Sequence, residues 1–226
     1  MPHLPTTIAA EPESGRRFPP QGVQTVVFDV VGTLVEPWPP VAEAYAAIGQ
    51  RHGAVVAVPE IDRRFRQAWK RQELIDAAAV PAFTTSRSRE ADRWRSIVTD
   101  VFVEHGRTAA IFAELWDHFG RPDSWRSLAA GSDLMREAIA SGATVALASN
   151  FDERLLMIAP AVTPLAWAGH VFASSEIGWR KPAPEFFRWI ENRLGVAPED
   201  LLLVGDDPEL DIAAATRAGW QSRAVG

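Results

Sequence analysis

The sequence predicts an α/β protein, a doubly wound parallel sheet with a four-helix bundle inserted after its first strand. Two observations lead to this class. Over the second half of the chain, short apolar runs alternate with amphipathic helical patterns, which is typical of parallel βαβ units. Between residues 41 and 121, helical patterns instead follow one another without an intervening strand, as they do in a helical bundle.

The first strand is expected at residues 25–28, where the run Thr-Val-Val-Phe suits a strand that is buried on both faces. Residues 1–22 are rich in proline and polar residues and lack the apolar core of a signal peptide, so we expect a flexible tail. Residues 36–40, Glu-Pro-Trp-Pro-Pro, interrupt the pattern after the strand and predict a linker.

Four amphipathic patterns follow this linker. Apolar residues recur at i, i+3, i+4 and i+7 in the first pattern, and similar spacings mark the other three. The positions are Val41, Ala44, Tyr45 and Ile48; Ile61, Phe65 and Trp69; Ala91, Trp94, Ile97, Val98, Val101 and Phe102; and Ile111, Phe112, Leu115, Trp116 and Phe119. Because each helix is apolar along one face, the four can bury these faces together. We therefore expect a core domain of residues 23–37 and 123–226 and a helical domain of residues 38–122.

From about residue 128 the chain alternates between helical and strand patterns. Strands are expected at residues 144–148, 170–173, 201–204 and 221–225, and helices at residues 184–194 and 208–218. Pro184 and Pro208 stand at first helical positions, and Asp207 is placed to cap the second of these helices. The alternation predicts a parallel sheet, in which the carboxyl ends of the strands share one edge.

The composition excludes several classes of function. A net charge of −6, from 23 basic and 29 acidic residues, offers no electrostatic footprint for nucleic acid. The absence of cysteine rules out disulfides and thiolate metal sites and suits a reducing cytoplasm, and no apolar run approaches the roughly 20 residues of a membrane span. The nine tryptophans fall largely at apolar helical positions, which favours core packing. We expect a cytoplasmic protein that binds neither nucleic acid nor membrane.

Polar residues mark the ends of three predicted strands. They are Asp29, the pair Ser149 and Asn150, and the group Asp206, Asp207 and Asp211. A fourth element is Lys181, in the run Trp-Arg-Lys-Pro-Ala-Pro before a helix. Open α/β sheets bind ligands at the carboxyl ends of their strands, so residues far apart in the sequence can converge there.

In this order and spacing, Asp29, Ser149, Lys181 and the pair Asp206 and Asp211 resemble the four motifs of the haloacid dehalogenase (HAD) superfamily. The resemblance covers residues 24–225. The stretches 149–155 and 175–182 are similar to the branch typified by the haloacid dehalogenase-like hydrolase domain-containing protein three. The resemblance implies a HAD-like Rossmannoid core with a helical cap of type C1, Mg²⁺ as the cofactor and a small phosphorylated molecule as the substrate.

The candidate catalytic residues are Asp29, Ser149 and Lys181. Phosphoryl transfer needs an in-line nucleophile and neutralisation of the phosphoryl charge. Asp29 can supply the attacking carboxylate and form an aspartyl-phosphate. Ser149 would donate a hydrogen bond to a phosphoryl oxygen, and Lys181 would offset the negative charge of Asp29 and phosphate. Ser149, Asn150 and Lys181 are also the candidate substrate-binding residues.

A metal site is expected beside them. Because Mg²⁺ prefers carboxylate and carbonyl oxygens while keeping several waters, Asp29 and Asp206 are its candidate ligands, with Asp207 and Asp211 behind them. The resemblance adds the backbone carbonyl of Val31 as the remaining protein ligand.

One residue departs from the family pattern. Motif one usually reads Asp-x-Asp-Gly-Thr, and in that family its second Asp is the general acid/base, whereas this chain has Val31 there. Losing positioned acid/base catalysis typically costs about 10²–10⁴-fold in rate. An ordinary phosphomonoesterase should therefore be poor unless the leaving group is good or a residue of the helical domain substitutes.

Alternatives to a phosphatase stay open for this reason. One is a non-catalytic or weakly catalytic HAD-like binding or regulatory protein. L-2-haloacid dehalogenases also lack the second Asp and need no metal, but their fourth motif has Ser-Asn character where this chain keeps Gly205-Asp206-Asp207. Phosphonoacetaldehyde hydrolases keep Mg²⁺ and use a cap lysine as a Schiff base. The lysine available for that role is Lys70, which we interpret as part of a solvated helix face.

Overall fold

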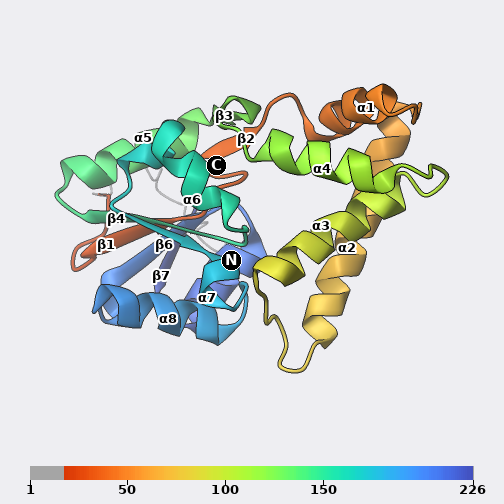
Figure 1. Cartoon of the computed structure of the whole chain (residues 1–226). Helices are drawn as coiled ribbons and strands as arrows, with labels where there is room; N and C mark the ends of the chain where they lie inside the picture. Colours follow the sequence, from red (N-terminus) through yellow and green to blue (C-terminus); the bar gives the residue numbers. More distant parts are fainter. Residues whose placement is uncertain (1–17, 226) are drawn as a thin grey trace, which may run out of the picture.

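A five-stranded parallel sheet runs through the part of the chain that the computed structural model describes, residues 18–225. Its strands are β1 (Thr25–Phe28), β4 (Thr144–Ser149), β5 (His170–Ala173), β6 (Leu201–Gly205) and β7 (Gln221–Ala224). They lie in the order β5-β4-β1-β6-β7, so the chain moves outward from β1 first on one side and then on the other (Figure 1). The predicted α/β class with a doubly wound parallel sheet is confirmed.

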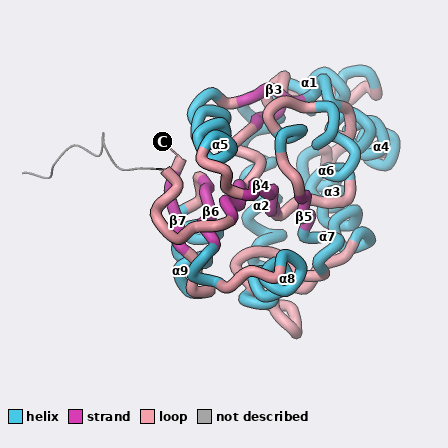
Figure 2. The backbone as a smooth tube through the Cα atoms, turned by 90° about the vertical axis from the view of Figure 1, so that its left-hand side faces the viewer, coloured by secondary structure: helices cyan, strands magenta, loops and turns pink. Residues whose placement is uncertain are grey.

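Helices cover both faces of the sheet. Alternate residues of β1 point to opposite faces, so Val26 and Phe28 join one hydrophobic cluster and Val27 joins another. The first cluster is completed by α5 (Ala129–Ala140) and α6 (Arg154–Ile158), and the second by α8 (Pro184–Leu194) and α9 (Ala214–Arg217). Figure 2 shows the strands between these layers. Burial on both faces explains why the central strands read as continuous apolar runs.

The amino-terminal tail was expected to extend to residue 22. Residues 1–17 lie outside the described part of the chain, whereas Phe18 is buried in the same cluster as Val26 and Phe28. The Arg223 guanidinium lies 4.7 Å from the Phe18 ring centroid. The chain therefore joins the core before residue 22, at an aromatic residue that a composition rich in proline conceals.

Four helices occupy the segment between β2 and β3, and we call this segment the helical insert. They are α1 (Val41–Arg51), α2 (Val58–Ala78), α3 (Arg87–Val101) and α4 (Thr108–Phe119). The insert has a hydrophobic cluster of its own, which includes Tyr45, Ile61, Ile97 and Ile111 from the four helices in turn. In Figure 1 it stands beside the sheet and its covering helices. Among residues 18–225 no helix, the 21-residue α2 included, has the length and hydropathy to cross a membrane.

The linker expected at residues 36–40 is in part a strand, which corrects the prediction. β2 (Val35–Pro37) pairs antiparallel with β3 (Trp125–Ser127), and the Trp38 N–H donates to the Ser124 carbonyl at 2.8 Å. Each strand has only three residues, and its partner lies on the far side of the insert, so no local periodicity could reveal the pair. This ribbon joins the entrance of the helical insert to its exit.

The ribbon suggests where the insert and the sheet hinge, although the division into two domains stays a prediction. We expect limited proteolysis to cut at residues 38–40 and 120–122 before it cuts inside the four helices, because short connections open more easily than packed helices. A bound substrate should protect both connections, as gating lids do. Free cutting within α1–α4 with both connections spared would contradict this division.

A buried ion cluster also fastens the insert to the sheet. Arg180, which precedes α8, donates to Glu90 of α3 at 2.7 Å and lies 3.3 Å from Glu73 and 3.4 Å from Asp76 of α2. The backbone N–H of Arg180 donates to the Phe83 carbonyl at 2.9 Å. Arg180, Glu90 and Asp76 are all buried, and the buried Arg93 pairs with the same two carboxylates, so each charge depends on the others for compensation.

Replacing Arg180 with alanine (R180A) should lower the free energy of unfolding by up to about 3–5 kcal/mol, because it leaves Glu90 and Asp76 buried with Arg93 as their main remaining partner. Urea titration would measure the loss. The matched control is R87A, which breaks the solvated Arg87–Glu176 pair between the same two parts and should change the stability little. Equal effects in the two variants would show that burial of the cluster is not what matters.

Candidate active site

Asp29 lies at the carboxyl end of β1, buried in the centre of the sheet edge. Its N–H donates to the Val204 carbonyl at 2.9 Å, which continues the pairing of β1 with β6. One carboxylate oxygen, Oδ1, accepts from Ser149 Oγ at 3.0 Å and from Lys181 Nζ at 2.7 Å. Burial raises the pKa of Asp29 to about 6, although the Lys181 ammonium opposes the rise. Its second oxygen, Oδ2, accepts no hydrogen bond from residues 18–225.

Lys181 is buried and bridges two carboxylates. Its ammonium donates to Asp29 and, at 2.5 Å, to Asp211. Burial alone would lower the pKa of Lys181, but Asp29 and Asp211 together raise it above its usual value. Lys181 is therefore a fixed positive charge.

Asn150 holds the Lys181 backbone. Its Oδ1 accepts the Lys181 N–H at 2.7 Å, and its Nδ2 donates to the Lys181 carbonyl at 3.0 Å. Both ends of the amide are thus engaged by the protein. This side chain therefore fixes the loop that carries the ammonium, and its predicted role in substrate binding stays a prediction.

Asp206 stands next to Asp29 at the end of β6. Its Oδ1 accepts from Thr33 Oγ1 at 3.0 Å, and Oδ2 accepts no hydrogen bond from the described residues. Gly32 has φ +88°, and a Cβ there would lie 2.4 Å from Asp206 Oδ2. The Gly-Thr pair after Asp29 therefore has two physical purposes, since glycine leaves space for this carboxylate and threonine orients it.

Asp207 and Asp211 have supporting contacts. Asp207 Oδ1 accepts from the N–H groups of Glu209 and Leu210 at 2.8 and 2.9 Å, so it caps the following helix as predicted. Asp211 uses one carboxylate oxygen for Lys181 and the other for the Asp207 N–H, at 3.1 Å. Both carboxylates therefore act within the protein.

The helix that carries Asp211 differs from the prediction. Residues 208–218 were expected to form one helix, but Pro208–Ala213 is a π-helix that continues as α9. A π turn rotates the side chains that follow relative to an α-helix, and such turns often occur at functional sites. Here the buried Asp211 faces Lys181 from this turn. Sequence periodicity cannot distinguish a single π turn from an α turn.

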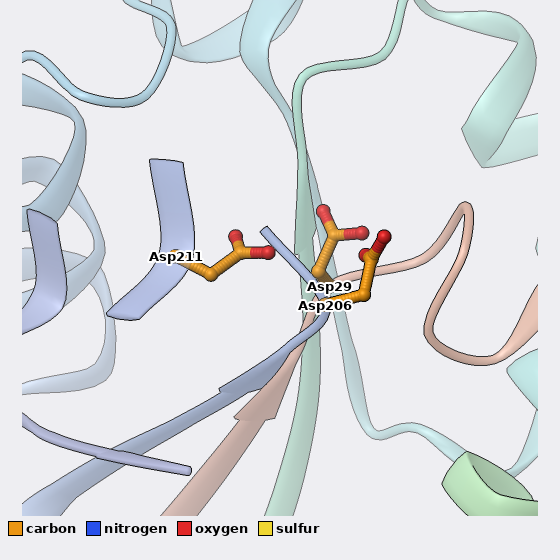
Figure 3. Close-up of side chains that lie close together, drawn as sticks. All are labelled: Asp29, Asp206 and Asp211. Atoms are coloured by element: carbon orange, nitrogen blue, oxygen red, sulfur yellow. The ribbon is translucent and has the colours of Figure 1, made fainter. Parts of the chain in front are cut away.

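Three carboxylates converge as a result. Asp29, Asp206 and Asp211 each offer an oxygen, and these oxygens lie within 4.8 Å of one another. Figure 3 shows the Asp29 and Asp206 carboxylates side by side at the strand ends, with Asp211 directed toward them from its helix. The predicted residues thus meet at one edge of the sheet, and their roles in metal binding and catalysis stay predictions.

A cavity of about 470 Å³ opens over these carboxylates, between the sheet edge and the helical insert. Val31 lines it and is 37% exposed. An apolar side chain therefore stands where the family pattern has its second Asp. Lys70 is exposed on α2 and is not among the residues that line the cavity. The solvated-face interpretation of Lys70 agrees with this position.

The helical insert contributes mostly aromatic side chains to the cavity, which sequence reasoning missed. Three tryptophans that the helical patterns assigned to core packing line this space, Trp69, Trp94 and Trp116, and Trp125 of β3 joins them. A cavity wall and a packed core leave the same apolar periodicity, so the pattern could not separate them. A second missed feature is Arg154, which pairs with Asp152 at 2.6 Å and donates to the Trp116 carbonyl at 2.8 Å.

Comparisons with known proteins agree with this architecture. The model of the haloacid dehalogenase-like hydrolases matches residues 23–219. The human haloacid dehalogenase-like hydrolase domain-containing protein 3 is 28% identical over 206 residues, which cover 88% of this chain and 80% of that protein. A phosphoserine phosphatase of Thermus thermophilus is 45% identical over 59 residues, 24% of each protein.

A solved structure extends the agreement to three dimensions. A defluorinating L-2-haloacid dehalogenase matches with a TM-score of 0.67 at 22% identity, covering 88% of this chain and 80% of that one. At this identity the match concerns the fold. Because the family model covers most of the sequence, the chain belongs to the haloacid dehalogenase-like hydrolases. Within this family it resembles the branch of the haloacid dehalogenase-like hydrolase domain-containing protein 3.

Proposed function

We propose that the protein is a Mg²⁺-dependent phosphatase that transfers the phosphoryl group of a small ester to Asp29. The observation that carries this proposal is the state of the Asp29 carboxylate. One oxygen is held by Ser149 and Lys181, and the other faces the cavity free of hydrogen bonds from residues 18–225. A carboxylate fixed at one oxygen and open at the other is suited to nucleophilic attack.

The residues beside Asp29 fit a magnesium ion. Asp206 also keeps one carboxylate oxygen free, and the Val31 carbonyl accepts no hydrogen bond from the described residues. Hard oxygen donors of this kind, few in number and supplemented by water, are what Mg²⁺ prefers. Gly32 preserves the space at Asp206, since a Cβ would fill it. When bound, the ion would neutralise charge on the phosphoryl group.

The chemistry of the chain's own residues then has two steps. Asp29 attacks phosphorus, the bond between phosphorus and the leaving oxygen breaks, and the leaving group departs with the electron pair. Lys181 holds a positive charge beside Asp29, which offsets the charge that phosphate brings. Water next splits the aspartyl-phosphate, which releases inorganic phosphate and restores the Asp29 carboxylate. Nothing at Val31 can protonate the leaving group or activate that water, so both steps lack acid/base assistance.

The competing proposals make different demands on the site. A Schiff-base mechanism needs a neutral lysine near the substrate. Lys70 does not line the cavity, and Lys181 has a raised pKa. A dehalogenase needs no acidic metal site, whereas this chain has Asp206, and Gly32 leaves room for its carboxylate. A binding protein that retains the site without turnover is the competitor that Val31 favours.

Thermal denaturation tests the metal site. Mg²⁺ at a hundredfold excess over its Kd should stabilise the wild type by about 2.7 kcal/mol, or roughly 5–10 °C in Tm. Asp206→Asn should remove most of this shift. Asp207→Asn is the matched control, because it removes an equal charge one residue away and asparagine caps a helix as well as aspartate does. Equal shifts in the wild type and Asp206→Asn would mean that the metal binds elsewhere.

A further inference from the structure

A belt of aromatic rings lines the cavity beside the carboxylates. Its members come from all four helices of the insert and from the segments after it: Tyr45, Phe65, Trp69, Trp94, Phe112, Trp116, Phe119, Trp125 and Phe151. Neighbouring rings are in contact around the belt, with centroids 5.6 Å apart for Trp69 and Trp94 and for Phe112 and Trp116. Such a surface binds flat apolar groups by stacking and edge contacts.

The positive charges that line the cavity are already engaged within the protein. Lys181 lies between two carboxylates, and Arg154 is paired with Asp152 and donates to the Trp116 carbonyl. Arg66 forms an ion pair with Asp62 on its own helix, and its side chain is 72% exposed. A substrate with a second anionic group would therefore find no free cation among the described residues of this cavity. A desolvated charge without a partner is costly, and only the solvated Arg66 could exchange its partner to provide one, so a second anionic group held away from Arg66 is disfavoured.

Val31 places an independent demand on the same substrate. Without a general acid, the leaving oxygen must depart as an anion. A phenol-type hydroxyl has a pKa of about 10, as in tyrosine, whereas water has a pKa of about 15.7, and an alkoxide is a comparably poor leaving group. A phenoxide therefore departs without the help that an alkoxide needs. The chemistry at Val31 and the shape of the cavity wall select the same class of molecule.

We propose that the physiological substrate is an aryl phosphate, in which phosphate esterifies a hydroxyl on a flat aromatic group that carries no second anionic group. This inference rests on the proposed phosphatase function. In the first step the bond between phosphorus and the aryl oxygen breaks, the phenoxide leaves with the electron pair and takes its proton from solvent, and Asp29 receives the phosphoryl group. The aromatic belt holds the departing ring.

The test compares two reactive phosphates in the presence of Mg²⁺. Acetyl phosphate has a good leaving group but no ring, so it reports the chemistry at Asp29, and 1-naphthyl phosphate reports the belt in addition. Trp69→Leu and Phe112→Leu should each lower kcat/KM for 1-naphthyl phosphate about 2- to 10-fold more than for acetyl phosphate, because each removes one aromatic contact with the naphthyl ring. Two variants are made so that the comparison can still be carried out if one of them does not fold.

Trp189→Leu is the matched control, because Trp189 lies on α8 outside the cavity, and the ratio of the two substrates should not change. A carboxylate added to the naphthyl ring should raise KM at least about tenfold, which corresponds to 1.4 kcal/mol. Equal losses on both substrates in the belt variants, or no penalty for the carboxylate, would overturn the aryl proposal. No hydrolysis of acetyl phosphate by the wild type would instead overturn the phosphatase function itself.

Discussion

Replacing Val31 with aspartate (V31D) is expected to raise the Mg²⁺-dependent turnover of phosphate esters, by up to about 10²–10⁴-fold. The new carboxyl would stand two residues from Asp29 and line the cavity, where it could protonate the leaving oxygen and then activate water. Val31 is 37% exposed, so the carboxyl would not be buried without hydrogen-bond partners. The gain should be larger for alkyl than for aryl phosphates, because a phenoxide needs less protonation. Steady-state assays on both ester types would measure it.

Val31→Asn is the matched control, since asparagine has the size and polarity of aspartate but cannot transfer the proton. It should leave turnover close to that of the wild type. If V31D folds, binds Mg²⁺ and gains nothing over Val31→Asn on several esters, the phosphotransfer account loses its main support. The binding-protein alternative would then become the better description of the chain.

Replacing Asp29 with asparagine (D29N) should abolish both turnover and any covalent phospho-enzyme. Asparagine keeps the shape of the side chain and can still accept from Ser149 and Lys181, but its amide is no nucleophile. Phosphate release and mass analysis of the protein would measure the two losses. Residual turnover at the level of the wild type would show that another group attacks phosphorus.

D29N should also change how the free energy of unfolding depends on pH. This readout shows whether a loss of turnover comes from the missing nucleophile or from a loss of the fold. The pKa of Asp29 is raised to about 6 in the folded protein, mainly by burial, whereas an unfolded Asp titrates near pH 4. A raised pKa means that this group's contribution to stability is present below about pH 4 and is lost as the pH rises through about 6. Without metal, the stability of the wild type relative to D29N should fall across that window. A constant difference from pH 4 to pH 7 would contradict the raised pKa.

The sequence was sufficient to predict the sheet and the convergence of its terminal carboxylates. Strands buried on both faces leave uninterrupted apolar runs, and parallel strands place their carboxyl ends on one edge, so Asp29 and Asp206 could be paired in advance. The β2–β3 ribbon could not be predicted, because two three-residue strands that pair across the whole insert carry no local signal. The burial of Phe18 was hidden in the same way, in a stretch whose composition suggests a tail.

The site was predictable in its residue types but not in their contacts. Motif positions identified Asn150 and Asp211, yet only the structure shows that Asn150 holds the Lys181 backbone and that a π turn directs Asp211 to the Lys181 ammonium. The aromatic belt was hidden for another reason. Residues such as Trp69 and Phe112 follow the helical periodicity of core residues whether they face a core or a cavity.

The central claim, that Asp29 receives the phosphoryl group and that Val31 leaves its hydrolysis unassisted, is tested most directly by a rapid-quench reaction with 1-naphthyl phosphate and Mg²⁺. The account predicts a burst of naphthol equivalent to the enzyme, followed by slow turnover, with one phosphoryl group on the peptide that contains Asp29. In V31D the burst should shrink, because hydrolysis of the intermediate speeds up, and in D29N both signals should vanish. Naphthol release without a phosphorylated Asp29 peptide, or the same label in D29N, would contradict it.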